Sequence, residues 1–323
     1  MNTTTGMLTP VPGSPYSVLN PISVVVETSA RFAYVADFTN NSIHEFTINQ
    51  ANGSLMEIAG SPIPAAGNPV AMVLDGSGKF LYTANQSDNS VSGFAIDATQ
   101  GTLTPILGSP FPAQLGTDSV AIDPVKNRLY AANGSSDTIS VFDIDTGTGA
   151  LSEIAGSPFT IGSIVGDYAR TIAVSPKGTF LYVADATSWG PESTSVFGFV
   201  IDANGALTPA PGSPFVAGTD PITLTFDAAG KFLYVANSKD SSISGFAIQP
   251  DGSLTPTPSS PYTTQPWPMC FGVDPSGKSL YVGHDSTALL VFTIDATTGA
   301  LTSEAGPMSG GGSPWSIAFA QIR

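Results

Sequence analysis

Phe-Leu-Tyr-Val-Ala at residues 180–184 decides the fold, because close variants of this stretch return along the whole chain. The variants are Phe32-Ala33-Tyr34-Val35-Ala36, Phe80-Leu81-Tyr82-Thr83-Ala84, Leu129-Tyr130-Ala131-Ala132, Phe232-Leu233-Tyr234-Val235-Ala236 and Leu280-Tyr281-Val282-Gly283. Their tyrosines stand at 34, 82, 130, 182, 234 and 281, which is a step of 47 to 52 residues. A repeat of this length with four short strands per unit predicts an all-β protein, a β-propeller.

The unit that begins at Pro69 shows the four expected strands, at residues 69–74, 79–84, 90–96 and 102–107. Each strand is bounded by turn-forming Gly, Asp, Ser or Pro, and no segment has helical periodicity. Proline lacks the amide hydrogen of a ladder and is tolerated mainly at sheet edges. The Gly-Ser-Pro after the fourth strand therefore predicts that this strand is the outer edge of each blade. The apolar first strand is expected to be the inner one.

The strand count is uneven along the chain. Inner strands are expected near residues 22, 70, 119, 171, 222, 269 and 315, whereas the second and third strands occur only six times. The chain opens on a lone outer strand at 7–15 and ends after a lone inner strand at 316–322. We therefore expect one β-propeller domain over residues 1–323, with seven inner strands, six complete four-stranded blades and an incomplete seventh. Either polypeptide is missing from this chain, or another chain fills the open side.

Composition excludes several classes of function. The formal charge is −15 and the pI is near 4.1, so the chain lacks the basic surface that binds nucleic acid or anionic membranes. No apolar stretch has the ~18 residues that a membrane helix needs. Cys270 is the only cysteine and is expected to be a buried small hydrophobe. No signal peptide is visible at the first residues, while the lysine-poor, Ser/Thr/Asn-rich composition favours an extracellular or cell-surface location, so the compartment stays open.

The repeat also resembles a known family. Its consensus is Pro-x-x-x-x-x-Asp-x-x-Gly-Lys-x-Leu-Tyr-Val-Ala-Asn, followed by Ser-x-Ser-x-Phe-x-Ile-Asp and Gly-x-Leu-Thr-Pro. Over residues 7–323 this is similar to the lactonase-like seven-bladed propellers, also described as Tyr-Val-Thr-Asn repeat proteins, some of which resemble 6-phosphogluconolactonase. The resemblance implies a Gly-Pro-Arg-His stretch at one inner strand of the enzymatic members. Here the stretch is Tyr168-Ala169-Arg170-Thr171, in which only Arg170 matches.

Three motifs that suggest other chemistry have simpler explanations. Gly272–Ser279 fits the P-loop pattern, but it lies in an expected hairpin turn, whereas a P-loop needs a following helix. The Asp-rich turns after the third strands offer one or two carboxylates each, and a calcium site needs roughly six to eight oxygens. His44 is expected on a sheet face, and no His/Cys cluster has zinc spacing. The sequence thus predicts no metal, no cofactor and no assigned catalytic residue.

Candidate ligand-binding residues come from departures from the repeat. Insertions at 164–168 and 188–192 fall in loops expected on one face of the propeller. Exposed aromatic residues beside a lone arginine are typical of recognition surfaces, although a tryptophan can equally fill a gap between blades. The residues expected on this face are Arg170, Tyr168, Trp189, Trp267, Trp315 and His284.

Two functions from different classes follow. The leading prediction is a non-enzymatic binding or self-assembling scaffold, in which a neighbouring subunit completes the seventh blade by β-augmentation and can build a filament. It rests on the missing histidine, the short loops and the open sheet edge. The alternative is a lactonase-like hydrolase of a sugar lactone, with Arg170 binding an anionic group and a loop carboxylate activating water. Glycan, peptide or small-anion binding without assembly is a third hypothesis.

Overall fold

The computed structural model describes residues 8–162, 167–187, 193–286, 288–304, 308–309 and 312–320, and all regular structure within these ranges is β. The chain forms two compact units. Unit 1 comprises residues 1–9 and 160–317, and unit 2 comprises residues 10–159 and 318–323. The assignment of residues 1–323 to a single domain stays a prediction.

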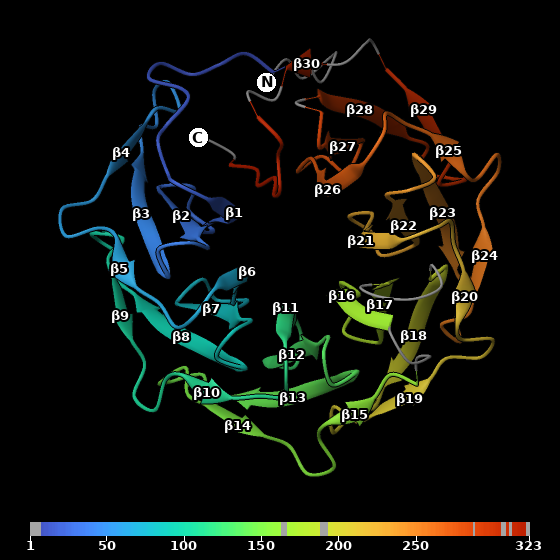
Figure 1. Cartoon of the computed structure of the whole chain (residues 1–323), viewed down its shortest axis with the longest axis horizontal. Coiled ribbons are helices and arrows are strands. Elements are labelled where there is room, and N and C mark those ends of the chain that lie inside the picture. Colours follow the sequence, from blue (N-terminus) through green and yellow to red (C-terminus); the bar gives the residue numbers. More distant parts are fainter. Residues whose placement is uncertain are drawn as a thin grey trace. The chain divides into compact units, whose positions relative to one another are not determined.

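Unit 2 holds the first three blades, each an antiparallel sheet (Figure 1). The first blade contains β1 (Pro21–Val26), β2 (Phe32–Asp37), β3 (Ser42–Ile48), β4 (Leu55–Glu57) and β5 (Ile63–Pro64). The second contains β6 (Pro69–Leu74), β7 (Phe80–Asn85), β8 (Ser90–Ile96), β9 (Leu103–Pro105) and β10 (Phe111–Pro112). The third contains β11 (Thr117–Asp123), β12 (Arg128–Asn133), β13 (Thr138–Ile144), β14 (Leu151–Glu153) and, at the unit boundary, β15 (Phe159–Thr160).

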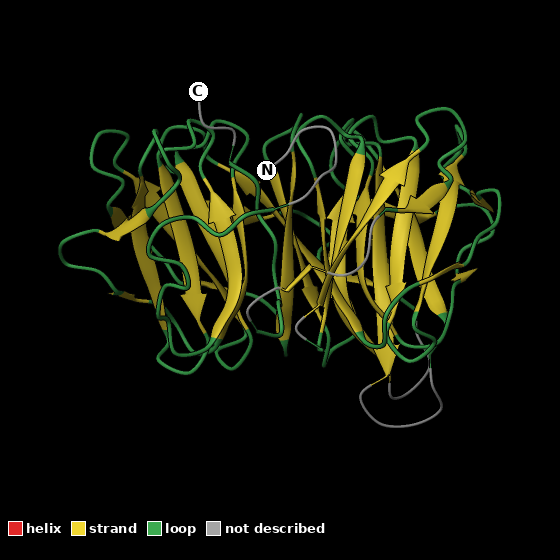
Figure 2. Cartoon of the chain, turned by 90° about the horizontal axis from the view of Figure 1, so that it is seen from above, coloured by secondary structure: helices red, strands yellow, loops and turns green. Residues whose placement is uncertain are grey.

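Unit 1 holds the next three blades in the same order. The fourth blade contains β16 (Asp167–Val174), β17 (Phe180–Thr187), β18 (Ser195–Ile201), β19 (Leu207–Pro209) and β20 (Phe215–Val216). The fifth contains β21 (Pro221–Phe226), β22 (Phe232–Asn237), β23 (Ser242–Ile248), β24 (Leu254–Pro256) and β25 (Tyr262–Thr263). The sixth contains β26 (Pro268–Val273), β27 (Ser279–His284), β28 (Ala288–Ile294), β29 (Leu301–Ser303) and β30 (Met308–Ser309). In Figure 2 loops connect the long strands at both of their ends.

The outer strand of each blade is made of two short pieces, which the sequence did not predict. In the fifth blade, β24 and β25 both pair with β23, and the Ser-Pro turn at 260–261 separates them. The Ser260 hydroxyl accepts a hydrogen bond from the Gly245 amide at 2.9 Å, so it satisfies a donor of β23 that the interruption leaves without a strand partner. The Ser-Pro turn therefore interrupts the edge strand and does not end it.

Repeated aromatic and glycine residues join neighbouring blades. The Tyr234 hydroxyl donates to the Gly299 carbonyl at 2.9 Å, and a Cβ on Gly299, whose φ is +72°, would lie 2.3 Å from the Phe232 ring. Glycine is required there by both the left-handed backbone and the close approach. Three further hydrogen bonds of this kind join Tyr34 to Gly101, Tyr82 to Gly149 and Tyr182 to Gly252, at 2.8–2.9 Å. These contacts explain why Phe, Tyr and Gly recur at the period of the repeat.

The described residues 8–15 and 312–320, where the outer and inner strands of the incomplete seventh blade were predicted, contain no regular β-strand. The sequence offers no second and no third strand for this blade. Ser313 and Pro314 contact the sixth blade: the Ser313 hydroxyl donates to the Asp285 carbonyl at 2.9 Å, and Cys270 Sγ contacts the Pro314 carbonyl at 3.2 Å. Cys270 is buried as predicted, and burial raises the pKa of its thiol to about 12.

The P-loop lookalike is the tight turn between β26 and β27, as predicted. Asp274 closes this turn by accepting hydrogen bonds from the amides of Ser276, Lys278 and Ser279. Burial by itself raises the pKa of Asp274, but these hydrogen bonds outweigh it and hold the pKa below its ordinary value. No helix long and apolar enough to span a membrane occurs among the described residues.

Candidate functional site

A β-bulge lies in the first strand of each of the six described blades, and in unit 1 it determines which side chains reach a pocket. In β16 the register passes from Ala169–Asp185 to Thr171–Ala184, so Arg170 is the extra residue. Ile222 and Met269 are the extra residues of β21 and β26. A bulge turns the side chain of its extra residue out of the regular alternation, and bulges are frequent beside functional sites.

Arg170, Ile222 and Met269 line one pocket of unit 1, because β16 contacts β21 and β21 contacts β26 (Figure 1). The cavity has a volume of about 210 Å³, below the roughly 300–1,000 Å³ of pockets for drug-sized ligands. Its remaining described lining residues are Ala186, Asp220, Ser238 and Trp267. The pocket therefore suits a ligand the size of a single small ring.

Asp220 is the carboxylate of the pocket, and three hydrogen bonds fix its position. Its amide donates to the Ser193 carbonyl and its carbonyl accepts from the Ser238 amide, both at 2.9 Å. Its Oδ2 also accepts from the Ser238 hydroxyl. The preceding loop is held as well, since the Gly218 amide donates to Asn237 Oδ1 at 3.0 Å. The carboxylate is thus presented by a rigid frame, as a catalytic or binding group requires.

Arg170 supplies the positive charge of the pocket. It is exposed, and its guanidinium makes no ion pair or hydrogen bond with any described residue. Arg170 and Asp220 are the charged side chains among the described lining residues. A guanidinium offers five N–H donors to a carbonyl, oxyanion or carboxylate. The pocket therefore combines an anion-binding group with a fixed carboxylate able to accept a proton.

The other residues expected on this face are placed differently. Trp267 lines the pocket and is 48% exposed, whereas Trp315 is 40% exposed and is not part of the lining. Tyr168 belongs to β16, but its side chain lies outside what the structure describes. Residues 164–166 of the first insertion and the whole second insertion, with Trp189, also lie outside the described residues. His284 is fully buried, and its Nε2 lies 2.7 Å from the Thr264 hydroxyl, so it does not reach the pocket.

Thr171 stands where the family resemblance implies a histidine. Its hydroxyl donates to the Ile222 carbonyl at 2.8 Å and so ties β16 to β21. The residue has a structural partner here and does not line the pocket. Among the residues that line it, the proton-accepting group is Asp220, which the sequence did not single out.

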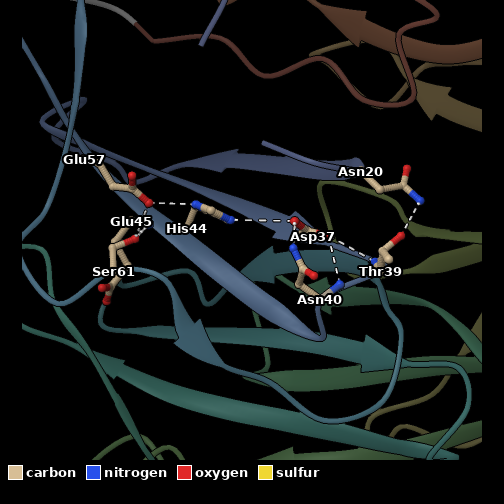
Figure 3. A network of polar contacts seen from close by, with 8 residues as sticks. All are labelled: Asn20, Asp37, Thr39, Asn40, His44, Glu45, Glu57 and Ser61. Atoms are coloured by element: carbon tan, nitrogen blue, oxygen red, sulfur yellow. Dashed lines mark hydrogen bonds and ion pairs between the residues drawn. The ribbon is translucent and has the colours of Figure 1, made fainter. Parts of the chain in front are cut away.

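A second polar network lies in the first blade, in unit 2 (Figure 3). His44 Nδ1 lies 2.7 Å from Glu57 Oε1, and its Nε2 lies 3.8 Å from Asp37 Oδ2. Glu57 also accepts from Ser61, and Asp37 accepts from two turn amides and from the Asn40 side chain. His44 stacks on Phe46, which agrees with the predicted sheet-face position. These groups are engaged in holding β2, β3 and β4 together.

Metal binding has no support in the described part of the chain, where no group of three or more His, Cys, Asp or Glu side chains could hold an ion. The Asp turns after the third strands bind their own backbone instead. For example, Asp295 Oδ1 accepts from the amides of Thr297 and Thr298 at 2.9 and 2.8 Å, and these hydrogen bonds lower the pKa of Asp295.

Solved structures with the same fold include two lactone hydrolases by title. A putative 6-phosphogluconolactonase from Bacteroides uniformis has a TM-score of 0.79 and 21% identity, over 94% of this chain and 89% of that one. The periplasmic gluconolactonase PpgL from Pseudomonas aeruginosa has a TM-score of 0.76 and 22% identity, over 95% and 90%. Hydrazine synthase from Kuenenia stuttgartiensis also matches, with a TM-score of 0.67 and 17% identity, over 98% and 92%. At these identities the likeness concerns the fold alone.

No curated protein matches the chain. The sequence model described as "Lactonase, 7-bladed beta-propeller" matches residues 17–116, 105–218 and 206–319, which together span nearly the whole sequence. The all-β propeller architecture and the family resemblance predicted from the repeat are both confirmed by this match. The chain therefore belongs to the lactonase family of seven-bladed β-propellers.

Proposed function

We propose that this protein hydrolyses a small sugar lactone in the unit 1 pocket. Membership of the lactonase family favours a hydrolase over the non-enzymatic scaffold that the missing histidine suggested. The neighbouring structure titled gluconolactonase suggests the substrate class, the lactone of a monosaccharide acid. The observation that carries the proposal is the presence of Arg170 and Asp220 in one pocket of suitable size.

The reaction needs a general base and a group that stabilises negative charge on the carbonyl oxygen. Asp220 is the base: Ser238 holds its Oδ2, and no described residue donates to its Oδ1, which is left for a water molecule. Water attacks the lactone carbonyl carbon while Asp220 takes its proton. Arg170 binds the oxyanion of the tetrahedral intermediate.

Collapse of the intermediate completes the reaction. The bond between the carbonyl carbon and the ring oxygen breaks, and the proton held by Asp220 passes to the ring oxygen, which becomes a hydroxyl. The product is an open-chain hydroxy acid, and its ionisation releases one proton to solvent. Arg170 then faces the product carboxylate.

The test is lactone hydrolysis followed by acid release at constant pH, with D-glucono-δ-lactone as substrate. The wild-type chain is expected to exceed the buffer rate, and Arg170→Ala is expected to lower kcat/KM by ~10²–10³-fold, as for loss of one oxyanion donor. The matched control is Lys177→Ala, an exposed cation in the turn at the opposite end of β16. A wild-type rate equal to that of buffer, or equal losses in both variants, contradicts the proposal.

A further inference from the structure

Trp267 has a backbone conformation that a tryptophan rarely adopts. Its φ is +56°, in the left-handed region that favours Gly, Asn and Asp. The residues that precede β6, β11 and β21 have the same conformation, and they are Asn68, Gly116 and Asp220, with φ between +52° and +68°. The repeat thus places small or turn-forming residues at this position, and the sixth blade alone among these four has a bulky one.

The turn itself explains why the conformation is kept. The Trp267 carbonyl accepts from the Asp285 amide at 3.0 Å, just as the Asn68 carbonyl accepts from Gln86 at 3.0 Å and the Asp220 carbonyl accepts from Ser238 at 2.9 Å. This hydrogen bond fixes the start of the first strand against the end of the second. The backbone geometry belongs to the fold, and the choice of tryptophan needs another reason.

Burial does not supply that reason. A tryptophan that fills a gap between blades would be buried, whereas Trp267 is 48% exposed. Backbone strain that packing does not repay is typical of residues kept for binding or catalysis. Trp267 lines the pocket next to Met269 and shares it with Arg170, Asp220 and Ser238. The pocket therefore presents polar groups from the fourth and fifth blades and an aromatic ring with a thioether from the sixth.

We propose that Trp267 stacks on the C–H face of the closed lactone ring and makes the pocket selective for the ring over the open-chain acid. The inference rests on the proposed function, because it takes a sugar lactone as the ligand. A closed sugar ring has hydroxyls at its edge and C–H groups on its faces, so it matches a pocket with polar groups on one side and an indole on the other. An open chain has no flat face to stack, so ring opening weakens the contact and aids product release.

The test compares two ligands by calorimetry, so that it needs no turnover. The ring ligand is the lactam of gluconic acid, in which nitrogen replaces the ring oxygen, and the open-chain ligand is gluconate. Wild type is expected to bind the lactam more tightly than gluconate. Trp267→Asn is expected to weaken lactam binding by about tenfold and gluconate binding by less than about twofold, and Trp267→Phe is expected to keep most of the preference.

Thermal unfolding separates recognition from packing. Asparagine suits the left-handed turn, so Trp267→Asn is expected to leave Tm unchanged or raise it by about 2–4 °C. The control Trp315→Asn, at a half-exposed tryptophan outside the pocket lining, is expected to leave both affinities unchanged. A fall in Tm with an unchanged ratio of the two affinities would show that Trp267 is a packing residue and overturn the inference, as would a wild-type chain that binds no lactam. Lactam selectivity without lactone hydrolysis would instead overturn the proposed function alone.

Discussion

Replacing Asp220 by asparagine separates the chemistry of the pocket from the stability of the fold. The backbone of Asp220 is left-handed, with φ +59°, and Asn68 holds the equivalent place before β6 with φ +52°. An asparagine oxygen can still accept from the Ser238 hydroxyl, and both backbone hydrogen bonds of residue 220 remain. The expected loss in free energy of unfolding is therefore below ~1 kcal/mol.

Catalysis is expected to respond much more strongly. Asn has no basic oxygen to take a proton from water, and a positioned general base typically contributes ~10²–10⁴-fold in rate. The expected fall in kcat/KM for lactone hydrolysis thus corresponds to about 3–5 kcal/mol of transition-state stabilisation. Acid release at constant pH measures the rate, and unfolding in guanidinium chloride measures the stability of the same preparation.

The matched control is Asp251→Asn, which changes an exposed carboxylate in the turn between β23 and β24 of the same blade. Its kcat/KM is expected to stay within twofold of wild type. The account of Asp220 as the base is refuted if Asp220→Asn retains kcat/KM within about threefold while the chain stays folded.

Three further predictions concern the fold and its assembly. Tyr234→Phe leaves the Gly299 carbonyl without its donor and is expected to cost ~1–3 kcal/mol in chemical denaturation. An unchanged free energy of unfolding would contradict the role of this blade-to-blade hydrogen bond. Burial raises the pKa of Glu45, although the Leu103 amide donates a hydrogen bond to its carboxylate. The protonated side chain therefore stabilises the fold below the ordinary glutamate pKa, and this stabilisation is lost as the pH rises through the raised pKa. Because glutamine cannot ionise, the free energy of unfolding of Glu45→Gln is expected to fall less than that of wild type between about pH 4 and pH 7. Equal falls in the two proteins would count against this. Self-association through the incomplete blade stays a prediction. Light scattering at micromolar concentration is expected to give a mass above the 33.0 kDa of one chain, and a mass equal to one chain would reject it.

Most of the fold could be predicted from the sequence because its contacts are themselves periodic. A tyrosine hydroxyl, a glycine carbonyl and a phenylalanine ring meet between successive blades, so these residue types must return at the step of the blade. The two-piece outer strand could not be predicted, because it depends on a serine hydroxyl that accepts from an amide of the neighbouring strand. The incomplete seventh blade could be predicted because the second and third strands of the repeat occur only six times.

The site was predicted only in part. Arg170 and Trp267 were found because they depart from the repeat, and both line the pocket. Asp220 was missed because an aspartate before a proline also serves ordinary turn chemistry, as the asparagine at position 68 does. Its place beside the bulge of β21 is the signal that could have singled it out. His284 was selected for its chemistry, but it occupies the buried strand end where Asn85 and Asn237 hold their own blades together.

A crystal structure of the chain with the lactam of gluconic acid tests the central claim most directly, because it shows where a closed sugar ring binds. The account predicts the ring in the unit 1 pocket, with its carbonyl oxygen at the Arg170 guanidinium, its C–H face on the Trp267 indole and Asp220 beside the carbonyl carbon. A ring bound elsewhere on the protein, with this pocket holding only water, would contradict it.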